Sequence, residues 1–149
     1  EQMPGIVRTQ VDVVLKNGAV VLNAADPAVR ELAAFCDGEV LFYADLDRAG
    51  SDTAAAIAAH RASKGGKGRA VLLRGGKIVL AQGAGETLLT NASLPAIAAL
   101  LAFAPDAPSQ ALAAIACGWY LELSADLIRA SLLRCAQEPD AQDDDNFRS

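Results

Sequence analysis

The first half of the chain alternates short apolar runs with a helix-like pattern. One run covers Ala19 to Leu22 and stops at a polar Asn-Ala-Ala-Asp-Pro segment, and a second run covers Glu39 to Ala44. The second run is bounded by turn residues and is almost entirely apolar, which is typical of a strand covered on both faces. Two such strands joined by one helix predict a right-handed βαβ unit in a parallel sheet.

The helix between these strands is predicted over about residues 27–36. Asp26 suits the N-cap, because its side chain can accept a hydrogen bond from a free helix N–H, and Pro27 suits the first helical position. Asp37-Gly38 then closes the helix. Before the first strand, "QVDVVL" reads as a further extended segment, and Lys16-Asn17-Gly18 reads as the turn between the two.

The second half combines a β-hairpin with helices. Leu72 to Leu80 is predicted as an antiparallel hairpin because Gly75-Gly76 separates two β-rich runs, and a third strand is predicted at Glu86 to Leu89. A helix capped by Ser51 or Asp52 should precede the hairpin, run to about Ala62 and end at Gly65-Gly66. Three helices should follow, over residues 95–103, 109–121 and 124–136, the last with a capped start at Ser124 and Asp126.

Composition places these elements in one α/β domain. The chain has 149 residues, of which 52% are hydrophobic, mostly Ala, Leu and Val, and only 5% are aromatic, so we expect an aliphatic core. We assign residues 1–136 to this domain. Residues 137–149 are acidic and poor in apolar residues, and we predict a disordered tail there.

The net charge and the cysteines restrict the classes of partner and the cellular compartment that we expect. A formal charge of −5 favours neither nucleic acid nor an anionic membrane surface. No segment has the length of a membrane span or the pattern of a secretory signal. The three widely spaced cysteines in apolar contexts predict buried, reduced thiols, so we expect a cytoplasmic protein: Cys36, Cys117 and Cys135. The chain starts at Glu1 rather than Met, and we expect it to be part of a longer protein.

No motif completes an active site. Gly65-Gly66-Lys67 and Gly75-Gly76-Lys77 lack the rest of a phosphate loop, and Leu88 stands where a dinucleotide fingerprint beginning at Gly83 needs its third glycine. His60 is the single histidine, and no Ser or Cys nucleophile motif accompanies it. The sequence therefore predicts no catalytic residue and no metal ligand in this chain.

Asn23 raises a question of its own, because it follows a buried strand. In open α/β sheets the carboxyl ends of the strands line the ligand crevice, so an amide at this place could bind a base or a ribose. The simpler interpretation makes Asn23 a turn residue and Asp26 only a helix cap. Spacing alone favours the simpler interpretation.

Three segments in this order resemble one known family. "VRTQVDVVLKNGAVVLNAADPAVRELAAFCDGEVLFYA" is similar to Q-V-D-V-V-x-x-x-G-x-A-V-L-N-A-x-D-P followed by C-D-G-E-V-x-F. "IAAHRASKGGKGRAVLLRGGKIVLAQG" is similar to I-x-x-H-x-x-x-G-G-x-A-V, and "LAAIACGWYLELSADLIRASL" to L-A-A-x-A-A-A-W-x-L-G-I-x-x-x-x-I-R-x-x-L. These patterns are those of the Mur-ligase-like region of cyanophycin synthetases, and the likeness covers Val7 to about Leu133 with gaps.

The resemblance implies part of an ATP-dependent amide ligase that polymerises aspartate and arginine. Such an enzyme activates a carboxylate as an acyl phosphate, which an amine then attacks, and the parent would use ATP and Mg²⁺. The chain would be the later half of the nucleotide-binding domain, an incomplete Mur ligase central domain lying after the phosphate loop. Its partners would be the remainder of the synthetase and, through it, aspartate, arginine and cyanophycin; a second copy is left open. Alone, the chain should hold no cofactor and be inactive.

Two departures from the family affect the nucleotide site. Ala25 stands where the family's N-A-D-D-P has its first carboxylate, and Gln110 stands where Mur-type ligases place an asparagine near the adenine. The cofactor-binding candidates are therefore Asn23 and Gln110.

Two function classes stay open. A working half-site predicts both candidate amides, Asn23 and Gln110, on one solvent-facing wall. A non-catalytic scaffold or interaction module derived from the same fold predicts that they are buried or scattered, and allows an apolar face for a partner.

Overall fold

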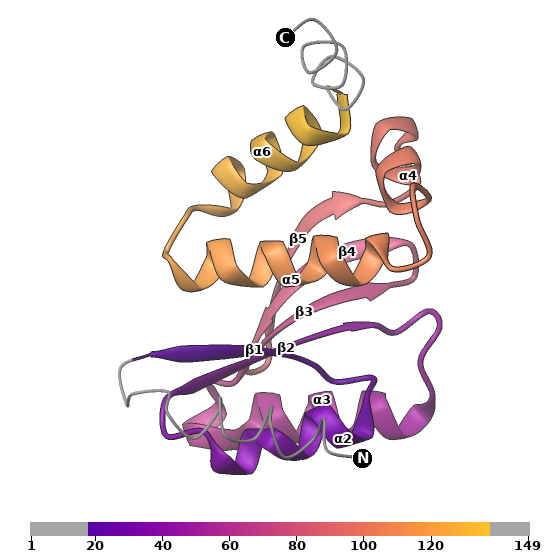
Figure 1. Cartoon of the computed structure of the whole chain (residues 1–149). Helices are drawn as coiled ribbons and strands as arrows, with labels where there is room; N and C mark the ends of the chain where they lie inside the picture. The colour runs from indigo at the N-terminus through magenta and orange to yellow at the C-terminus, as the bar shows by residue number, and fades with distance from the viewer. Residues whose placement is uncertain (1–17, 138–149) are drawn as a thin grey trace, which may run out of the picture.

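Five strands form one mixed sheet in the computed structural model, which describes residues 18–137 (Figure 1). The strand order is β1-β2-β3-β4-β5, with β1, β2 and β3 parallel and the β3–β4 and β4–β5 pairs antiparallel. Their bounds are β1 Ala19–Asn23, β2 Glu39–Asp45, β3 Arg69–Arg74, β4 Lys77–Gln82 and β5 Gly85–Asn91. The structure thus has the α/β class and the partly parallel sheet that the sequence predicts.

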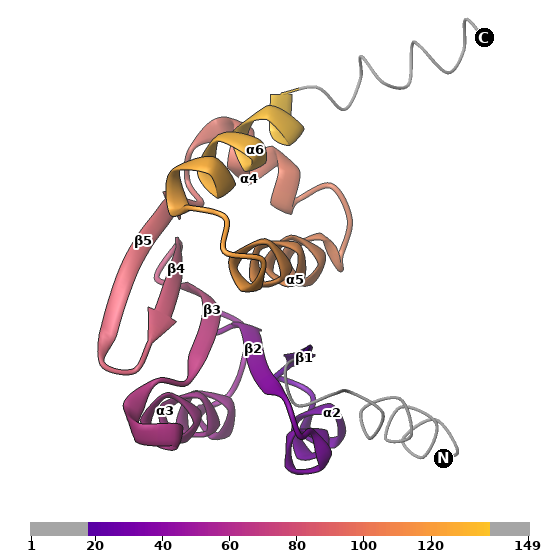
Figure 2. The ribbon, with the colours of Figure 1, turned by 90° about the vertical axis from the view of Figure 1, so that its left-hand side faces the viewer.

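Helices cover both faces of this sheet. α2 (Pro27–Glu31), its 3₁₀ continuation η1 (Leu32–Phe35) and α3 (Ser51–Gly66) lie on one face, and α5 (Ala107–Tyr120) lies on the other, across the parallel strands (Figure 2). α4 (Pro95–Leu101) and α6 (Ala125–Gln137) pack against each other and against α5, and α6 also contacts β5.

The two faces of the parallel strands bury two separate apolar clusters. Phe42 of β2 packs with Ile57 of α3 on one face, and its neighbour Leu41 packs with Leu112 of α5 on the other. Successive strand side chains point to opposite faces, so a run without polar interruptions needs helices on both sides. Each fully buried aliphatic or aromatic side chain contributes about 1.5–3 kcal/mol. The predicted parallel pair of strands with a helix between them is confirmed.

The predicted hairpin and one helix cap are also confirmed. Gly75 and Gly76 have φ values of 60° and 71°, the left-handed conformations that a tight hairpin turn of this kind requires. The Ser124 hydroxyl accepts a hydrogen bond of 3.1 Å from the Leu127 N–H at the start of α6, as a cap does.

Several details differ from the predictions. The predicted helix over residues 27–36 is α-helical only to Glu31 and then tightens to 3₁₀, because Leu32 is its single buried residue and little apolar surface holds a longer helix. The N-cap of α3 is Gly50 rather than Ser51 or Asp52, and α5 begins at Ala107, two residues before the predicted start.

The cysteine prediction is wrong in part. All three thiols are free, but Cys117 and Cys135 are exposed and Cys36 is half-buried. An apolar local sequence does not reveal this exposure, since Cys135 borders the space between α5 and α6 rather than the core. The predicted extended segment before Gly18 and the predicted tail after residue 137 lie outside the described residues.

Residues 18–137 contain no helix with both the length and the apolar character needed to cross a membrane.

A three-residue ion cluster ties α3 to the hairpin. The Glu86 carboxylate of β5 receives hydrogen bonds from Arg74 at 2.5 and 3.0 Å and from Arg61 of α3 at 2.8 Å. Arg61 also donates to the Gly83 carbonyl at 2.7 Å. The bonds from Arg74 and then Arg61 lower the pKa of the Glu86 carboxyl to about 2.

This pKa predicts an acid-sensitive contribution to stability. The native pKa lies below the usual value of 4.5, so the contribution is complete above about pH 4.5 and is lost as the pH falls toward 2. The Glu86 side chain is 32% exposed, and solvent screening reduces the contribution to about 1 kcal/mol. Urea unfolding should show the wild type losing about that much more stability than Glu86→Gln between pH 5 and pH 2.5. Parallel pH profiles for the two proteins would contradict the assignment.

Candidate functional site

Asn23 ends β1 at the carboxyl edge of the parallel strands. Its Oδ1 accepts a hydrogen bond of 3.0 Å from the Ala25 N–H, which makes the local turn that the simpler interpretation predicts. No described residue bonds to its Nδ2, and the side chain is half-buried. The oxygen of Asn23 therefore has a structural role in this turn.

Asp26 caps the helix that follows this turn. Its Oδ1 accepts hydrogen bonds from the N–H groups of Ala28 at 3.0 Å and Val29 at 3.4 Å, and Pro27 occupies the first turn. Asp26 is exposed and does not line the hollow that contains Asn23. The cap role predicted for Asp26 is confirmed.

The carboxyl end of β2 adds charged groups beside Asn23. Asp45 is the last residue of β2, its Oδ1 accepts from the Asp47 N–H at 3.2 Å, and its Oδ2 lies 3.7 Å from the Arg48 Nε. The Asp45 side chain is 13% exposed, whereas that of Arg48 is 73% exposed. Asp47 accepts from the N–H groups of Gly75 and Gly76 at 2.7 and 3.1 Å, which fixes the loop against the β3–β4 turn.

The amino end of α5 closes one side of this edge. We name the resulting space of about 180 Å³ the carboxyl-edge hollow, and its lining residues are Asn23, Ala25, Asp45, Arg48, Ala49, Pro105, Pro108 and Ser109. A second space of about 320 Å³ shares Asp45, Arg48 and Pro108 with it and is floored by apolar residues that include Leu73 and Leu101. Three elements thus meet around one partly open space whose lining mixes polar and apolar residues.

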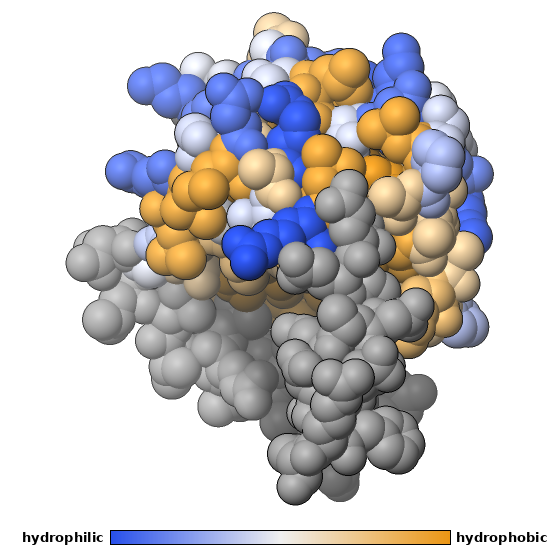
Figure 3. Space-filling model, turned by 90° about the horizontal axis from the view of Figure 1, so that it is seen from above, coloured by the Kyte–Doolittle hydropathy of each residue, from blue (hydrophilic) through white to orange (hydrophobic). Residues whose placement is uncertain are grey.

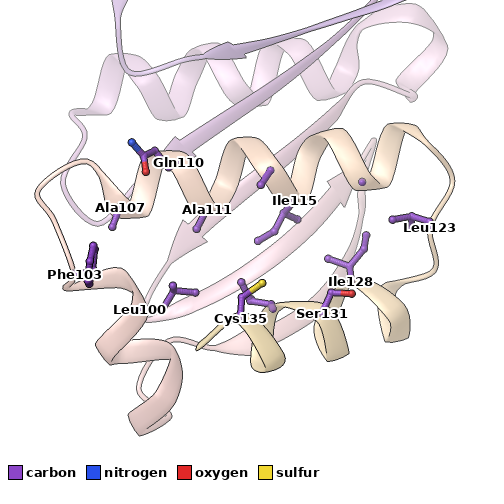
Figure 4. A pocket seen from close by; sticks show the side chains of 13 residues that line it. Leu100, Phe103, Ala107, Gln110, Ala111, Ile115, Leu123, Ile128, Ser131 and Cys135 are labelled. Atoms are coloured by element: carbon purple, nitrogen blue, oxygen red, sulfur yellow. The ribbon is translucent and has the colours of Figure 1, made fainter. Parts of the chain in front are cut away.

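Gln110 lies elsewhere. It is exposed on α5, and its Nε2 donates to the Asp106 Oδ2 at 2.8 Å. It borders a different space, between α5 and α6, and its amide points away from α6 (Figure 4). The structure therefore brings Asn23 together with Ser109, the neighbour of Gln110, and not with Gln110 itself.

Ser109, Asp45 and Arg48 are the lining residues that the sequence interpretation missed. The buried positions of α5 include Pro108, Leu112 and Ile115, so at 100° per residue Gln110 falls opposite the buried stripe and Ser109 beside it. That periodicity is a signal in the sequence that could have identified Ser109. Asp45 directly follows the predicted strand Glu39 to Ala44, so its place at the carboxyl edge could have been inferred, whereas Arg48 belongs to a polar loop and carries no comparable signal.

The space between α4, α5 and α6 forms an apolar groove of about 380 Å³ (Figure 4). Small residues, Ala107, Ala111, Ala114 and Gly118, line much of its α5 wall together with Gln110 and Ile115, and Leu123 stands at its far end. Phe103 lines the other end and is 82% exposed. Seen from above, apolar surface interrupts the charged surface in several patches (Figure 3).

Neither hollow has the components of a catalytic centre. Within residues 18–137 no group of three or more His, Cys, Asp or Glu side chains could hold a metal ion. His60 lies away from both hollows, its Nε2 is 3.0 Å from the Arg69 carbonyl oxygen, and its ring meets Phe42 edge-on. The carboxyl-edge hollow offers amide, hydroxyl, carboxylate and guanidinium groups, which can bind and orient a polar ligand. No protein-family model matches the chain, and no curated protein matches it either.

We expect Asp26→Ala to lower the unfolding free energy by about 1 kcal/mol, the usual effect of a lost N-cap, while Asp26→Asn preserves most of the stability because it keeps the acceptor oxygen. Urea titrations of the three proteins followed by circular dichroism measure both differences. Equal stability of all three proteins would show that the cap contributes nothing.

Proposed function

We propose that this chain is the later half of a Mur-ligase-like nucleotide-binding domain in an ATP-dependent amide ligase similar to cyanophycin synthetase. The observation that supports the proposal is the carboxyl-edge hollow, where the ends of β1 and β2 meet the amino end of α5. Ligands of open α/β sheets bind at the carboxyl ends of the strands. The motif resemblance names ATP as the ligand, and the polar lining suits part of a nucleotide.

In this proposal the chain binds and orients, and other parts of the ligase supply the chemistry. Asn23 directs its free amide donors to the base or ribose, and the Ser109 hydroxyl offers a second polar contact from α5. The phosphate loop and Mg²⁺, which stabilise the charge of the transferred phosphoryl group, belong to the remainder of the parent. Gln110 takes no part in this hollow, so Ser109 replaces it as the proposed contact from α5.

The apolar groove supports a second candidate function, that of an interaction module. Phe103 and Leu123 stand exposed at its ends, and the small α5 residues between them would let another chain approach closely. Exposed apolar surface of this kind marks contact sites in many proteins. In the first function the groove would serve packing within the ligase; in the second it would be the functional surface itself.

The chain alone should show no ATP hydrolysis and no ligation of arginine or aspartate, because it lacks a phosphate loop and the residues 18–137 offer no metal-binding cluster. A coupled phosphate-release assay on the purified chain, with a heat-inactivated sample as the control, measures this. Turnover above that control would contradict the proposed division of labour.

In the complete parent ligase, Asn23→Ala should weaken ATP use by about tenfold, since one lost hydrogen bond to a ligand costs about 1.4 kcal/mol. Its melting temperature should change only by the small effect of the lost turn hydrogen bond from the Ala25 N–H. Asn91→Ala is the matched control, because the Asn91 Oδ1 also accepts a turn hydrogen bond, from the Ser93 N–H at 2.9 Å, but Asn91 lies outside the carboxyl-edge hollow. Steady-state kinetics and thermal melts of both variants separate activity from stability.

The two candidate functions differ in the outcome. If Asn23→Ala and Asn91→Ala affect stability equally and leave ATP use unchanged, Asn23 is only a turn residue. If Phe103→Ser then prevents this chain from assembling with the rest of the parent ligase, the interaction module is favoured.

A further inference from the structure

The outer edge of β1 is open among the described residues. β1 is the first strand of the sheet, and no other strand of residues 18–137 pairs with its far side. The Ala24 N–H donates to the Tyr43 carbonyl at 2.9 Å, and the Gly18 carbonyl accepts from the Glu39 N–H at 3.0 Å. In a parallel ladder alternate residues bond to the same neighbour, so the even-numbered residues of β1 face β2. The backbone groups of Ala19, Val21 and Asn23 therefore face outward.

This edge lacks three features that often protect an edge strand. β1 reads Ala-Val-Val-Leu-Asn, without a charge, a proline or a bulge. The opposite edge of the sheet is different, because Arg129 of α6 donates to the β5 carbonyls of Leu89 at 2.5 Å and Leu88 at 3.1 Å. Among residues 18–137, side-chain hydrogen bonds thus cover the β5 edge but not the β1 edge.

We propose that residues 11–16 of this same chain dock on the open edge of β1 as an antiparallel strand, joined to it by Asn17-Gly18. A two-residue hairpin loop at Asn17-Gly18 makes Lys16 and Ala19 the first hydrogen-bonded pair. The next hydrogen-bonded pairs are then Val14 with Val21 and Asp12 with Asn23. A two-residue loop thus requires that the backbone N–H and C=O groups of residues 19, 21 and 23 face away from β2. These are the residues whose backbone groups do not bond to β2.

The side-chain pattern agrees with the same register. Val20 and Leu22 of β1 point to the cluster beneath α2 and α3. Their cross-strand neighbours in this register are Leu15 and Val13, both apolar, so the docked strand would extend that cluster. The charged Asp12 and Lys16 fall on the other face with Val14 between them. A shift of one residue would put both charges against the α2–α3 cluster.

Amide hydrogen exchange on the full chain tests the pairing. The N–H groups of Ala19, Val21 and Asn23 should exchange at least about 100-fold more slowly than in an unfolded peptide, and we expect the same of the β2-bonded amides of Val20 and Leu22. Exchange of the three outward amides at the rate of the unfolded peptide would overturn the proposal.

Two proline variants with opposite parity make the test specific. Val14→Pro removes an N–H that faces β1 in this register, so the Val21 amide should exchange at least about tenfold faster than in the wild type. Val13→Pro removes an N–H that faces away from β1, so the Val21 amide should stay protected. Equal behaviour of the two variants would refute the register. If Val14→Pro fails to fold, contacts between the α-protons of Leu15 and Val20 in the NMR spectrum of the wild type decide the question, and their absence refutes it.

A second copy of the chain is the competing occupant. Antiparallel pairing of β1 with β1 of another copy would also protect the outward amides. Protection that increases with protein concentration, together with a dimer in sedimentation, would overturn the proposal, while concentration-independent protection of a monomer supports it.

Discussion

The fold depends on three parallel strands that are apolar on both faces. Leu41 and Phe42 of β2 are adjacent in the chain and buried in opposite directions, so neither face of the sheet tolerates water. Parallel neighbours also need crossover connections, and the helices that make them supply the cover for one face. α5 then has to cover the other face, which brings its amino end to the carboxyl ends of β1 and β2. The candidate site thus follows from the need to cover both apolar faces of the sheet with helices.

Elements dictated by local chemistry could be predicted from the sequence. Gly75 and Gly76 can adopt the left-handed turn at little cost, and Asp26 before Pro27 has a side chain of the right length to cap a helix. Elements that depend on tertiary packing could not. α2 ends early because it has little to bury, and Cys135 is exposed although it borders the space between α5 and α6, so its exposure depends on how these two helices pack.

The candidate site shows the same division. Asn23 could be placed at the carboxyl edge because it ends a recognisable strand. The choice between Ser109 and Gln110 depends on the rotation of α5, and adjacent helix residues point about 100° apart. Of these two adjacent residues, Ser109 therefore lies at the carboxyl-edge hollow, and Gln110 with its amide lies at the border of the apolar groove. Arg48 comes close to Asn23 only because β1 and β2 are paired in register, with Asn23 opposite Tyr43.

The polar bonds are distributed unevenly between the two ends of the parallel strands. At the amino end, Arg69 forms two hydrogen bonds with Glu39, at 2.6 and 2.7 Å, and stacks 5.0 Å from the Trp119 ring. At the carboxyl end, Asn23 and Asp45 bond mainly to the backbone of their own turns, Arg48 pairs with Asp45 at 3.7 Å through an exposed side chain, and no residue among 18–137 bonds to the Asn23 amide donors. Groups that are committed to internal ion pairs make an end rigid, whereas a binding surface needs polar groups that are held in place but not consumed. This difference, rather than any single residue, makes the carboxyl end the better candidate for ligand binding.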